Sequence, residues 1–277
     1  MPSATVTGFA GLKEEAHVDL GLHGKRAWVL GASAGLGKAT AAALAAEGAH
    51  VAVSSRNAER LQEACAEIGG TAAVPLVVAA GRQAIEDACA AAAGRLGGLD
   101  IVVSNHGGPP AATFDGIDDA MFEGAFELIL ASAFRVTKAA LPHLRSAGGG
   151  VLAYVTSSST REVLPNLLLS NTMRTGVTAM VKTLSRELAP DGIRLFCAAP
   201  GRISTERADS VDAFTAERQG TTFEEVRAAM AREIPAGRYG EPREFGDLVA
   251  FLCSERASYV TGVTALIDGG RLWGVAS

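Results

Sequence analysis

The chain has 277 residues, of which 48% are hydrophobic and 20% are charged, and its formal net charge is −5. A chain of this size and composition can bury a large core in one α/β domain or two small ones. The acidic balance, with no block of Lys or Arg, argues against a nucleic-acid surface. No apolar run approaches the roughly 20 residues of a membrane span, and no export signal is visible. We therefore expect a cytoplasmic protein with neither a nucleic-acid nor a membrane partner.

The cysteines carry no pairing or metal signature. Cys65, Cys89, Cys197 and Cys253 are scattered along the chain and form no CxxC pair. This usage is typical of reduced, buried thiols in a reducing compartment. We expect no disulfide framework and no metal site.

The first recognisable unit is a short apolar stretch that runs into a glycine-rich turn. Arg26–Leu30 is predicted to be a strand, residues 31–37 form the turn, and the Ala-rich residues 38–47 continue as a helix that stops at Gly48. Glycines allow the backbone to turn tightly and to approach a pyrophosphate, which then lies on the helix N-terminus. The order of strand, turn and helix therefore predicts a phosphate-binding βα unit.

The second predicted strand, His50–Ser55, ends beside Arg56. In dinucleotide-binding folds the tip of this strand meets the adenosine ribose, where an acidic side chain binds a free 2′-hydroxyl and an Arg accommodates a 2′-phosphate. Ser55 and Arg56 stand here without a neighbouring carboxylate. The pair favours NADP(H) as the cofactor, with a solvated surface arginine as the alternative interpretation of Arg56.

Helical and strand patterns alternate along the rest of the chain. Further helices are predicted over 58–68, 83–96, 120–145, 165–188 and 242–254, and further strands over 73–78, 100–104, 151–155, 193–198 and 263–267. Repeated βα units predict a doubly wound, mostly parallel sheet with helices on both faces, the Rossmann fold. Residues 1–17 lack periodicity and are expected to form an extension, with 18–277 as a single domain. The polar stretch 203–236 is interpreted as an insertion that covers the substrate.

A run of hydroxyl side chains marks the expected site of chemistry. Residues 156–160 are all Ser or Thr and directly follow the predicted strand 151–155. Ser170 and Arg174 stand four residues apart, so they share one face of the next helix. In an open α/β sheet, ligands bind outside the carboxyl ends of the strands. We therefore expect the reaction to take place between the hydroxyl run and this helix face.

Several short motifs occur in the order found in one large family of oxidoreductases. They are Gly31, Gly35 and Gly37 in the turn, Ser104-Asn105-His106-Gly107, Ala199-Pro200-Gly201 with Thr205, Tyr259-Val-Thr-Gly262, and Asp268-Gly-Gly270. By these motifs the chain, from about residue 18 onward, resembles the short-chain dehydrogenase/reductase family. The resemblance implies a Rossmann fold and a nicotinamide cofactor.

The resemblance also implies which residues hold that cofactor. Ile203 and Thr205 would hold the nicotinamide amide, and Asn105 would line the adenosine side. The expected cofactor-binding residues are Gly31, Ser33, Gly35, Leu36, Gly37, Ser55, Arg56, Asn105, Gly107, Arg174, Pro200, Gly201, Ile203 and Thr205.

The catalytic positions depart from the family pattern. The family's reductases use a Tyr as proton donor, a Lys four residues later, a Ser thirteen residues before the Tyr, and an Asn in the preceding helix. The corresponding residues here are Ser170, Arg174, Ser157 and Ile129. A phenol titrates near 10 and can donate a proton when a cation lowers its pKa, whereas an aliphatic hydroxyl is a far poorer acid. Hydride delivery is therefore expected to be intact and proton delivery by the protein to be lost.

The changed pattern has precedents within the family. A branch called 3-oxoacyl-carrier-protein reductase-like carries Ser and Arg at the two positions, and the chain is also similar to aromatic polyketide ketoreductases that lack the Tyr. We expect Ser157, Ser170 and Arg174 to be the catalytic residues, with the serines holding the carbonyl and Arg174 holding the ribose. A hydroxyaryl ketone carries a phenol next to its carbonyl, and this phenol could supply the missing proton.

The resulting hypothesis is an NADPH-dependent ketoreductase of a hydrophobic, polycyclic aromatic, polyketide-type ketone, with a proton from substrate or water. Two alternatives stay open: a non-catalytic NADP-binding sensor or complex subunit, and a 3-oxoacyl or small-ketone reductase with another proton donor. Tyr154 lies three residues from Ser157 in a strand, so it points to the opposite face and is expected in the core. His106 is expected on the surface or stabilising its loop. Family members pair their two long helices, which implies a homodimer or homotetramer.

Overall fold

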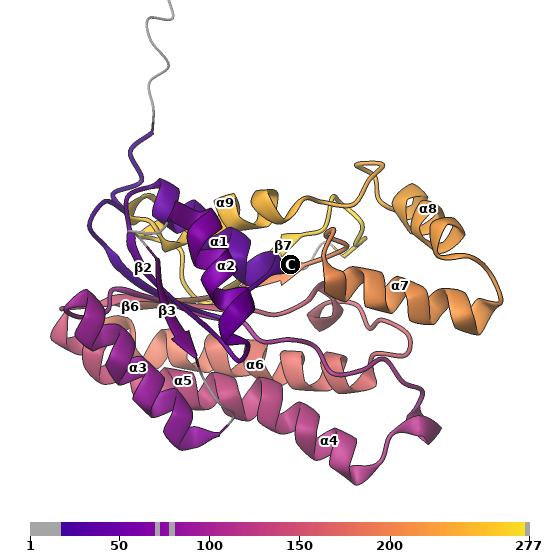
Figure 1. The fold of residues 1–277 in the computed structure, drawn as a ribbon, viewed down its shortest axis with the longest axis horizontal. Helices are drawn as coiled ribbons and strands as arrows, with labels where there is room; N and C mark the ends of the chain where they lie inside the picture. The colour runs from indigo at the N-terminus through magenta and orange to yellow at the C-terminus, as the bar shows by residue number, and fades with distance from the viewer. Residues whose placement is uncertain (1–17, 70–72, 78–80, 275–277) are drawn as a thin grey trace, which may run out of the picture.

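The computed structural model describes residues 18–69, 73–77 and 81–274 (Figure 1). The extension expected over 1–17 lies outside these residues. Seven strands form one sheet in the order β3-β2-β1-β4-β5-β6-β7, and every neighbouring pair is parallel. The strands are β1 Arg26–Leu30, β2 His50–Ser55, β3 Ala73–Val77, β4 Ile101–Ser104, β5 Gly150–Val155, β6 Ile193–Pro200 and β7 Val263–Ile267. The strand order reverses between β1 and β4, as in the predicted doubly wound fold.

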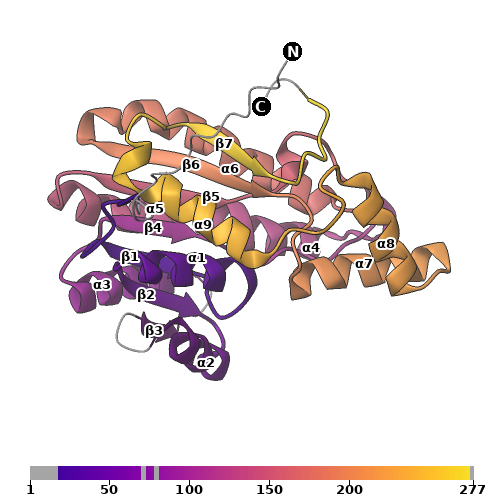
Figure 2. The ribbon, with the colours of Figure 1, turned by 90° about the horizontal axis from the view of Figure 1, so that it is seen from above.

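Helices cover both faces of the sheet, as predicted (Figures 1 and 2). One face packs α1 Gly35–Ala46, α2 Ala58–Gly69 and α9 Pro242–Cys253; the other packs α3 Arg82–Leu96, α5 Ser132–Ser146 and α6 Leu168–Glu187. Successive strand residues point to opposite faces, so Trp28 belongs to the α3/α5/α6 core and Val29 to the α1/α2/α9 core. Both side chains are fully buried, which explains why the central strands are apolar throughout.

The helix predicted over 120–145 is present as a continuous helical segment over 119–146, but it is not α-helical throughout. The segment consists of α4 Asp119–Ala125, a π-helical stretch Phe126–Ala131, and α5. A π turn widens the helix by one residue through a local change of hydrogen bonding and has no signature in the hydrophobic pattern. Ile129 lies in this stretch and packs into the core, with 2% of its surface exposed.

The insertion 203–236 forms two helices beyond the carboxyl ends of the strands (Figure 2). They are α7 Glu206–Gln219 and α8 Phe223–Glu233. The fully buried Asp212 anchors α7, because its carboxylate accepts hydrogen bonds from Arg202 and from the Tyr239 hydroxyl, both at 2.7 Å. A buried carboxylate with two donors costs little to hold in place. Short 3₁₀ turns occur at Phe114–Gly116, Ser158–Thr160, Ala189–Asp191 and Glu255–Ala257.

The described residues also bear on membrane spans, metal sites and cysteines. Of the helices in the described residues, none is long and apolar enough to cross a bilayer. Within that same part of the chain, His, Cys, Asp and Glu side chains nowhere gather as a metal-binding group. All four cysteines are buried and free, which confirms the prediction of reduced structural thiols.

Candidate active site

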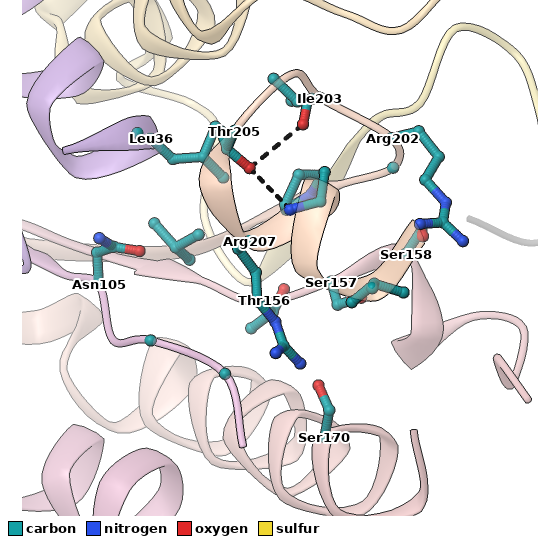
Figure 3. A pocket seen from close by; sticks show the side chains of 18 of the residues that line it. Leu36, Asn105, Thr156, Ser157, Ser158, Ser170, Arg202, Ile203, Thr205 and Arg207 are labelled. Atoms are coloured by element: carbon teal, nitrogen blue, oxygen red, sulfur yellow. Dashed lines mark hydrogen bonds between the residues drawn. The ribbon is translucent and has the colours of Figure 1, made fainter. Parts of the chain in front are cut away.

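A cavity of about 450 Å³ opens at the carboxyl ends of the central strands (Figure 3). It brings together most of the residues predicted to bind the cofactor, namely Gly31, Gly35, Leu36, Asn105, Gly107, Arg174, Pro200, Gly201, Ile203 and Thr205. Ser157 and Ser170 line it as well. The remaining predicted residues, Ser33, Gly37, Ser55 and Arg56, lie outside the lining.

The glycine turn is shaped to receive a phosphate. Gly31 and Gly35 adopt positive φ angles of 61° and 54°, a conformation that strains other residues. Helix α1 begins at Gly35, and its N-cap Ala34 supplies no side-chain hydrogen bond to the first N–H groups. Both residues line the cavity. Because uncapped N–H groups at a helix N-terminus bind anions, the turn fits the diphosphate of a dinucleotide.

Asn105 fixes the turn from the neighbouring strand. Its side-chain amide donates a hydrogen bond of 2.9 Å to the carbonyl of Gly31. Gly107 follows in the same loop, and a Cβ built on it would contact nothing within 4 Å. The loop therefore offers bare backbone to the cavity, where a flat ligand group can lie against it.

The tip of β2 stands beside the turn. The Ser55 hydroxyl hydrogen-bonds to that of Ser33 at 2.8 Å, which ties β2 to the glycine turn. Arg56 is exposed and forms no ion pair with any residue in the described ranges. Its guanidinium is thus available to a phosphate at this corner.

Ser170 and Arg174 form a buried pair one helical turn apart. The Arg174 Nε donates to the Ser170 hydroxyl oxygen at 3.3 Å, and only 7% and 8% of the two residues are exposed. Arg174 also donates to the carbonyls of Val155 at 2.8 Å and of His106 and Gly107 at 3.4 Å. Burial, with a smaller effect from the charge of Arg207, lowers the pKa of Arg174 to about 10. Arg174 remains a cation near neutral pH and braces α6 against the ends of β5 and β4.

Ser157 supplies a second hydroxyl to the cavity, beside that of Ser170. Its backbone is extended, and its Oγ accepts a hydrogen bond of 3.1 Å from the N–H of Ser159. Ser170 likewise uses its oxygen as an acceptor. Each hydroxyl therefore keeps its own hydrogen free to donate to a ligand oxygen.

Comparison with known proteins identifies the family. The family model described as Enoyl-(Acyl carrier protein) reductase matches residues 31–271. The human Dehydrogenase/reductase SDR family member 4 is 32% identical over 253 residues, which cover 90% of this chain and 88% of that protein. The chain belongs to the short-chain dehydrogenase/reductase family. As a member of it, the protein is an NAD(P)-dependent oxidoreductase.

Solved structures of short-chain dehydrogenases/reductases share the fold over nearly the whole chain. L-sorbose reductase from Gluconobacter frateurii, solved with NADPH and L-sorbose, has a TM-score of 0.87 at 29% identity, covering 93% of this chain and 100% of that one. Actinorhodin polyketide ketoreductase, solved with NADPH, has a TM-score of 0.86 at 28% identity, covering 89% and 97%. Both neighbours therefore hold the cofactor expected from the sequence.

The two other candidate proton donors of this short-chain dehydrogenase/reductase, Tyr154 in the core and His106 in the cavity lining, are both held by hydrogen bonds to other side chains. Tyr154 is buried in the core, as predicted, and its hydroxyl lies 2.6 Å from that of Thr137. Burial raises the pKa of Tyr154 well above its ordinary value. His106 is half-buried and not a surface residue; it hydrogen-bonds to Ser104 at 2.8 Å and Ser132 at 3.4 Å, which stabilises its loop. Burial, and to a lesser degree the charge of Arg174, lowers its pKa to about 4, so the ring is neutral near pH 7.

Arg207, which no motif in the sequence singled out, enters the cavity of this short-chain dehydrogenase/reductase from α7. Its guanidinium donates a hydrogen bond of 2.6 Å to the carbonyl of Pro109. Burial lowers its pKa. The nearby Thr205 caps α7 by accepting from the N–H of Ala208, and its hydroxyl donates to the carbonyl of Ile203, both at 3.3 Å (Figure 3). No motif of the insertion indicated that Arg207 would reach the site.

Proposed function

We propose that the protein is an NADPH-dependent ketoreductase of a hydrophobic, polycyclic aromatic ketone of the polyketide type, and that the proton comes from the substrate or from water. The observation that supports the proposal is the buried Ser170–Arg174 pair in the cavity lining. By the motif spacing in the sequence, we infer that Ser170 stands where the family's reductases have their Tyr proton donor. A serine hydroxyl binds an oxygen well but releases its proton poorly.

The residues of the cavity have separable tasks in this reaction. The bound cofactor supplies the hydride. Ser157 and Ser170 donate hydrogen bonds to the ketone oxygen and orient its carbon toward the nicotinamide. Arg174 offers its planar fork to the ribose hydroxyls, a task that does not require it to lose a proton. Because these groups position and polarise the carbonyl without protonating it, the alkoxide must be protonated by another group.

Neither alternative donor of the chain suits this task. Tyr154 is held against Thr137 in the core. His106 is neutral near pH 7, because its pKa lies near 4, and a neutral imidazole is a weak acid. A phenol adjacent to the ketone is already next to the oxygen that needs the proton. The substrate is therefore the best-placed source.

The lining of the cavity supports an apolar substrate. Leu164 and Leu167 line it from the segment just before α6, and Val211 lines it from α7. The similarity to actinorhodin polyketide ketoreductase also favours a polyketide-type ketone as the substrate. The test is NADPH consumption with a panel of polycyclic hydroxyaryl ketones, acyl thioesters and sugars. Turnover of the hydroxyaryl ketones supports the proposal; tight NADPH binding without turnover of any ketone would instead indicate a non-catalytic cofactor-binding protein.

We also propose that NADP(H) is preferred to NAD(H), because Arg56 is free to pair with the 2′-phosphate. A charge-assisted hydrogen bond of this kind contributes about 1.5–3 kcal/mol. Arg56→Ala should therefore weaken NADPH binding by about tenfold or more and leave NADH binding nearly unchanged. Fluorescence titration with both cofactors measures this. Arg243→Ala, which removes an exposed cation of α9, is the control. Equal affinity of the unmutated protein for the two cofactors would refute the assignment.

Exposed aromatic side chains mark a candidate surface for assembly. The helical segment 119–146 exposes Phe122, Phe126 and Phe134 at 46%, 42% and 49%. Aromatic side chains exposed together on one segment indicate an interaction surface. We expect a homodimer or homotetramer that covers this segment, and Phe134→Glu should shift the protein to a smaller species. Light scattering at micromolar concentration measures the mass; a monomer at that concentration contradicts the expectation.

A further inference from the structure

Two of the arginines that line the cavity lack an acidic partner. Arg174 donates to Ser170 and to three backbone carbonyls, and Arg207 donates to the carbonyl of Pro109. No Asp or Glu among the described residues forms an ion pair with either. The two other lining arginines differ: Arg202 pairs with Asp212 at 2.7 Å and Arg271 pairs with Glu233 at 3.2 Å. Half of the lining arginines are thus left without a counter-charge.

The acidic residue in the described lining of the cavity does not supply that counter-charge. It is Glu206, which is exposed and pairs with Arg60 on α2. The charge of Arg207 also disfavours the charged form of Arg174. Two partly desolvated cations that share a cavity without an anion are costly to maintain. An anionic ligand group would remove this cost.

Arg207 is directed toward the expected substrate and not toward the diphosphate turn. Its side chain extends from the start of α7 toward Thr156 and Ser170, whereas Leu36 marks the glycine turn on the other side of Thr205 (Figure 3). The turn already has the uncapped N-terminus of α1 for its anion. Arg207 is therefore the cation next to the ketone-binding hydroxyls.

We propose that Arg207, supported by the charge of Arg174, forms an anion subsite for the substrate, which binds the acidic hydroxyl beside the ketone and stabilises its ionised form. The inference rests on the proposed function and specifies its substrate class as ketones with an ionisable hydroxyl at the neighbouring position. An opposite charge within about 4–6 Å lowers the pKa of an acid by roughly 1–3 units. The arginines thus do for a substrate phenol what a neighbouring cation does for a tyrosine.

The proton balance of the step follows directly. The carbonyl carbon receives the hydride, and the electron pair of the C=O π bond moves to oxygen as an alkoxide. The O–H bond of the neighbouring phenol breaks, and its proton forms the new O–H bond of the alcohol. The phenolate that remains is bound by Arg207, is stabilised by the charge of Arg174, and takes a proton from solvent after release. The only reductant is NADPH, and no protein group changes its protonation state.

The decisive experiment measures the pKa of a bound phenol without turnover. The probe is 1-hydroxy-2-acetonaphthone, whose phenol and phenolate differ in absorbance, titrated with pH in complex with the protein and NADP⁺. We expect the pKa of the bound phenol to lie about one unit or more below that of the free ketone. Arg207→Met should return it to the free value, whereas Arg207→Lys, which keeps the charge, should retain most of the shift. NADPH affinity should be the same in all three proteins.

Controls separate the subsite from other effects. Arg161→Met removes an exposed cation close in sequence to the hydroxyl run but outside the cavity lining, and should leave the bound phenol's pKa unchanged. Arg207→Met should slow reduction of the phenol ketone but not of its methyl ether, which has no proton to lose. A variant that weakens NADPH binding and leaves the phenol's pKa unchanged would assign Arg207 to the cofactor and overturn the proposal.

The pKa of the bound phenol and the turnover of the ketone together distinguish failure of the subsite from failure of the proposed function. If the phenol ketone is reduced but its bound pKa equals the free value, the subsite is refuted and the ketoreductase assignment stands. If the pKa is shifted but no ketone is reduced, the subsite is supported as a phenolate-binding site and the assignment as a reductase of such ketones fails.

Discussion

Methylation of the phenol beside the ketone is expected to slow reduction by about 10²-fold or more, the low end of the range for general acid catalysis. The ether keeps the carbonyl that the hydride attacks, and it keeps the hydrogen bonds that Ser157 and Ser170 can donate. It lacks the proton that the alkoxide must receive. Steady-state rates for the phenol and the ether, measured with saturating NADPH, give the ratio.

The ether must be shown to enter the cavity, since an added methyl group can clash. Competition of the ether against the parent ketone, or direct calorimetry in the presence of NADP⁺, supplies that control. A bound but slowly reduced ether supports proton supply by the substrate. A bound ether reduced as fast as the phenol would mean that the protein or an ordered water donates the proton.

Gly37→Ala is expected to have the second large effect, through the shape of the phosphate turn. A Cβ at this position would lie 2.3 Å from the carbonyl oxygen of Gly31 and 2.7 Å from the side-chain nitrogen of Asn105. These two groups hydrogen-bond to each other, so the methyl group must break the contact that fixes the turn. Overpacking of this kind costs about 1–3 kcal/mol, and we expect NADPH to bind about tenfold more weakly, or worse.

Gly94→Ala is a matched control for Gly37→Ala. Gly94 also lies within a helix, α3, but a Cβ there meets nothing within 4 Å. Such a change should leave NADPH binding unchanged and raise stability by about 0.4–1 kcal/mol. Thermal unfolding and NADPH titration on both variants test the contrast. Unaltered affinity in Gly37→Ala would show that the turn does not hold the cofactor in the way we describe.

Most of the fold could be predicted because its signals are local. Each buried parallel strand is a short apolar run closed by a turn, and each helix is a breaker-free amphipathic stretch, so all seven strands begin within one residue of the predicted start. The π-helical stretch at Phe126–Ala131 was missed, because it changes backbone hydrogen bonds without changing the apolar pattern.

The site could be predicted only where a motif follows a strand end. The glycine turn, Asn105 and the Ser170–Arg174 pair all stand at such positions and meet in the cavity. Arg207 does not: it lies in an insertion with weak periodicity, and its partner Pro109 is 98 residues away in sequence. Long-range proximity of this kind depends on how α7 folds back over the sheet, and nothing in the residues around Arg207 indicates it.

The most direct test of proton supply by the substrate is the turnover of Ser170→Ala with a hydroxyaryl ketone. Ser170 accepts a hydrogen bond from Arg174 and, in our account, only positions the ketone oxygen. The variant should therefore keep measurable turnover, with a rate loss smaller than the 10²–10⁴-fold typical of a lost general acid. Ser157→Ala should behave in the same way. Loss of activity in Ser170→Ala across that full range, with ketone and NADPH still bound, would make Ser170 the proton donor and contradict the account.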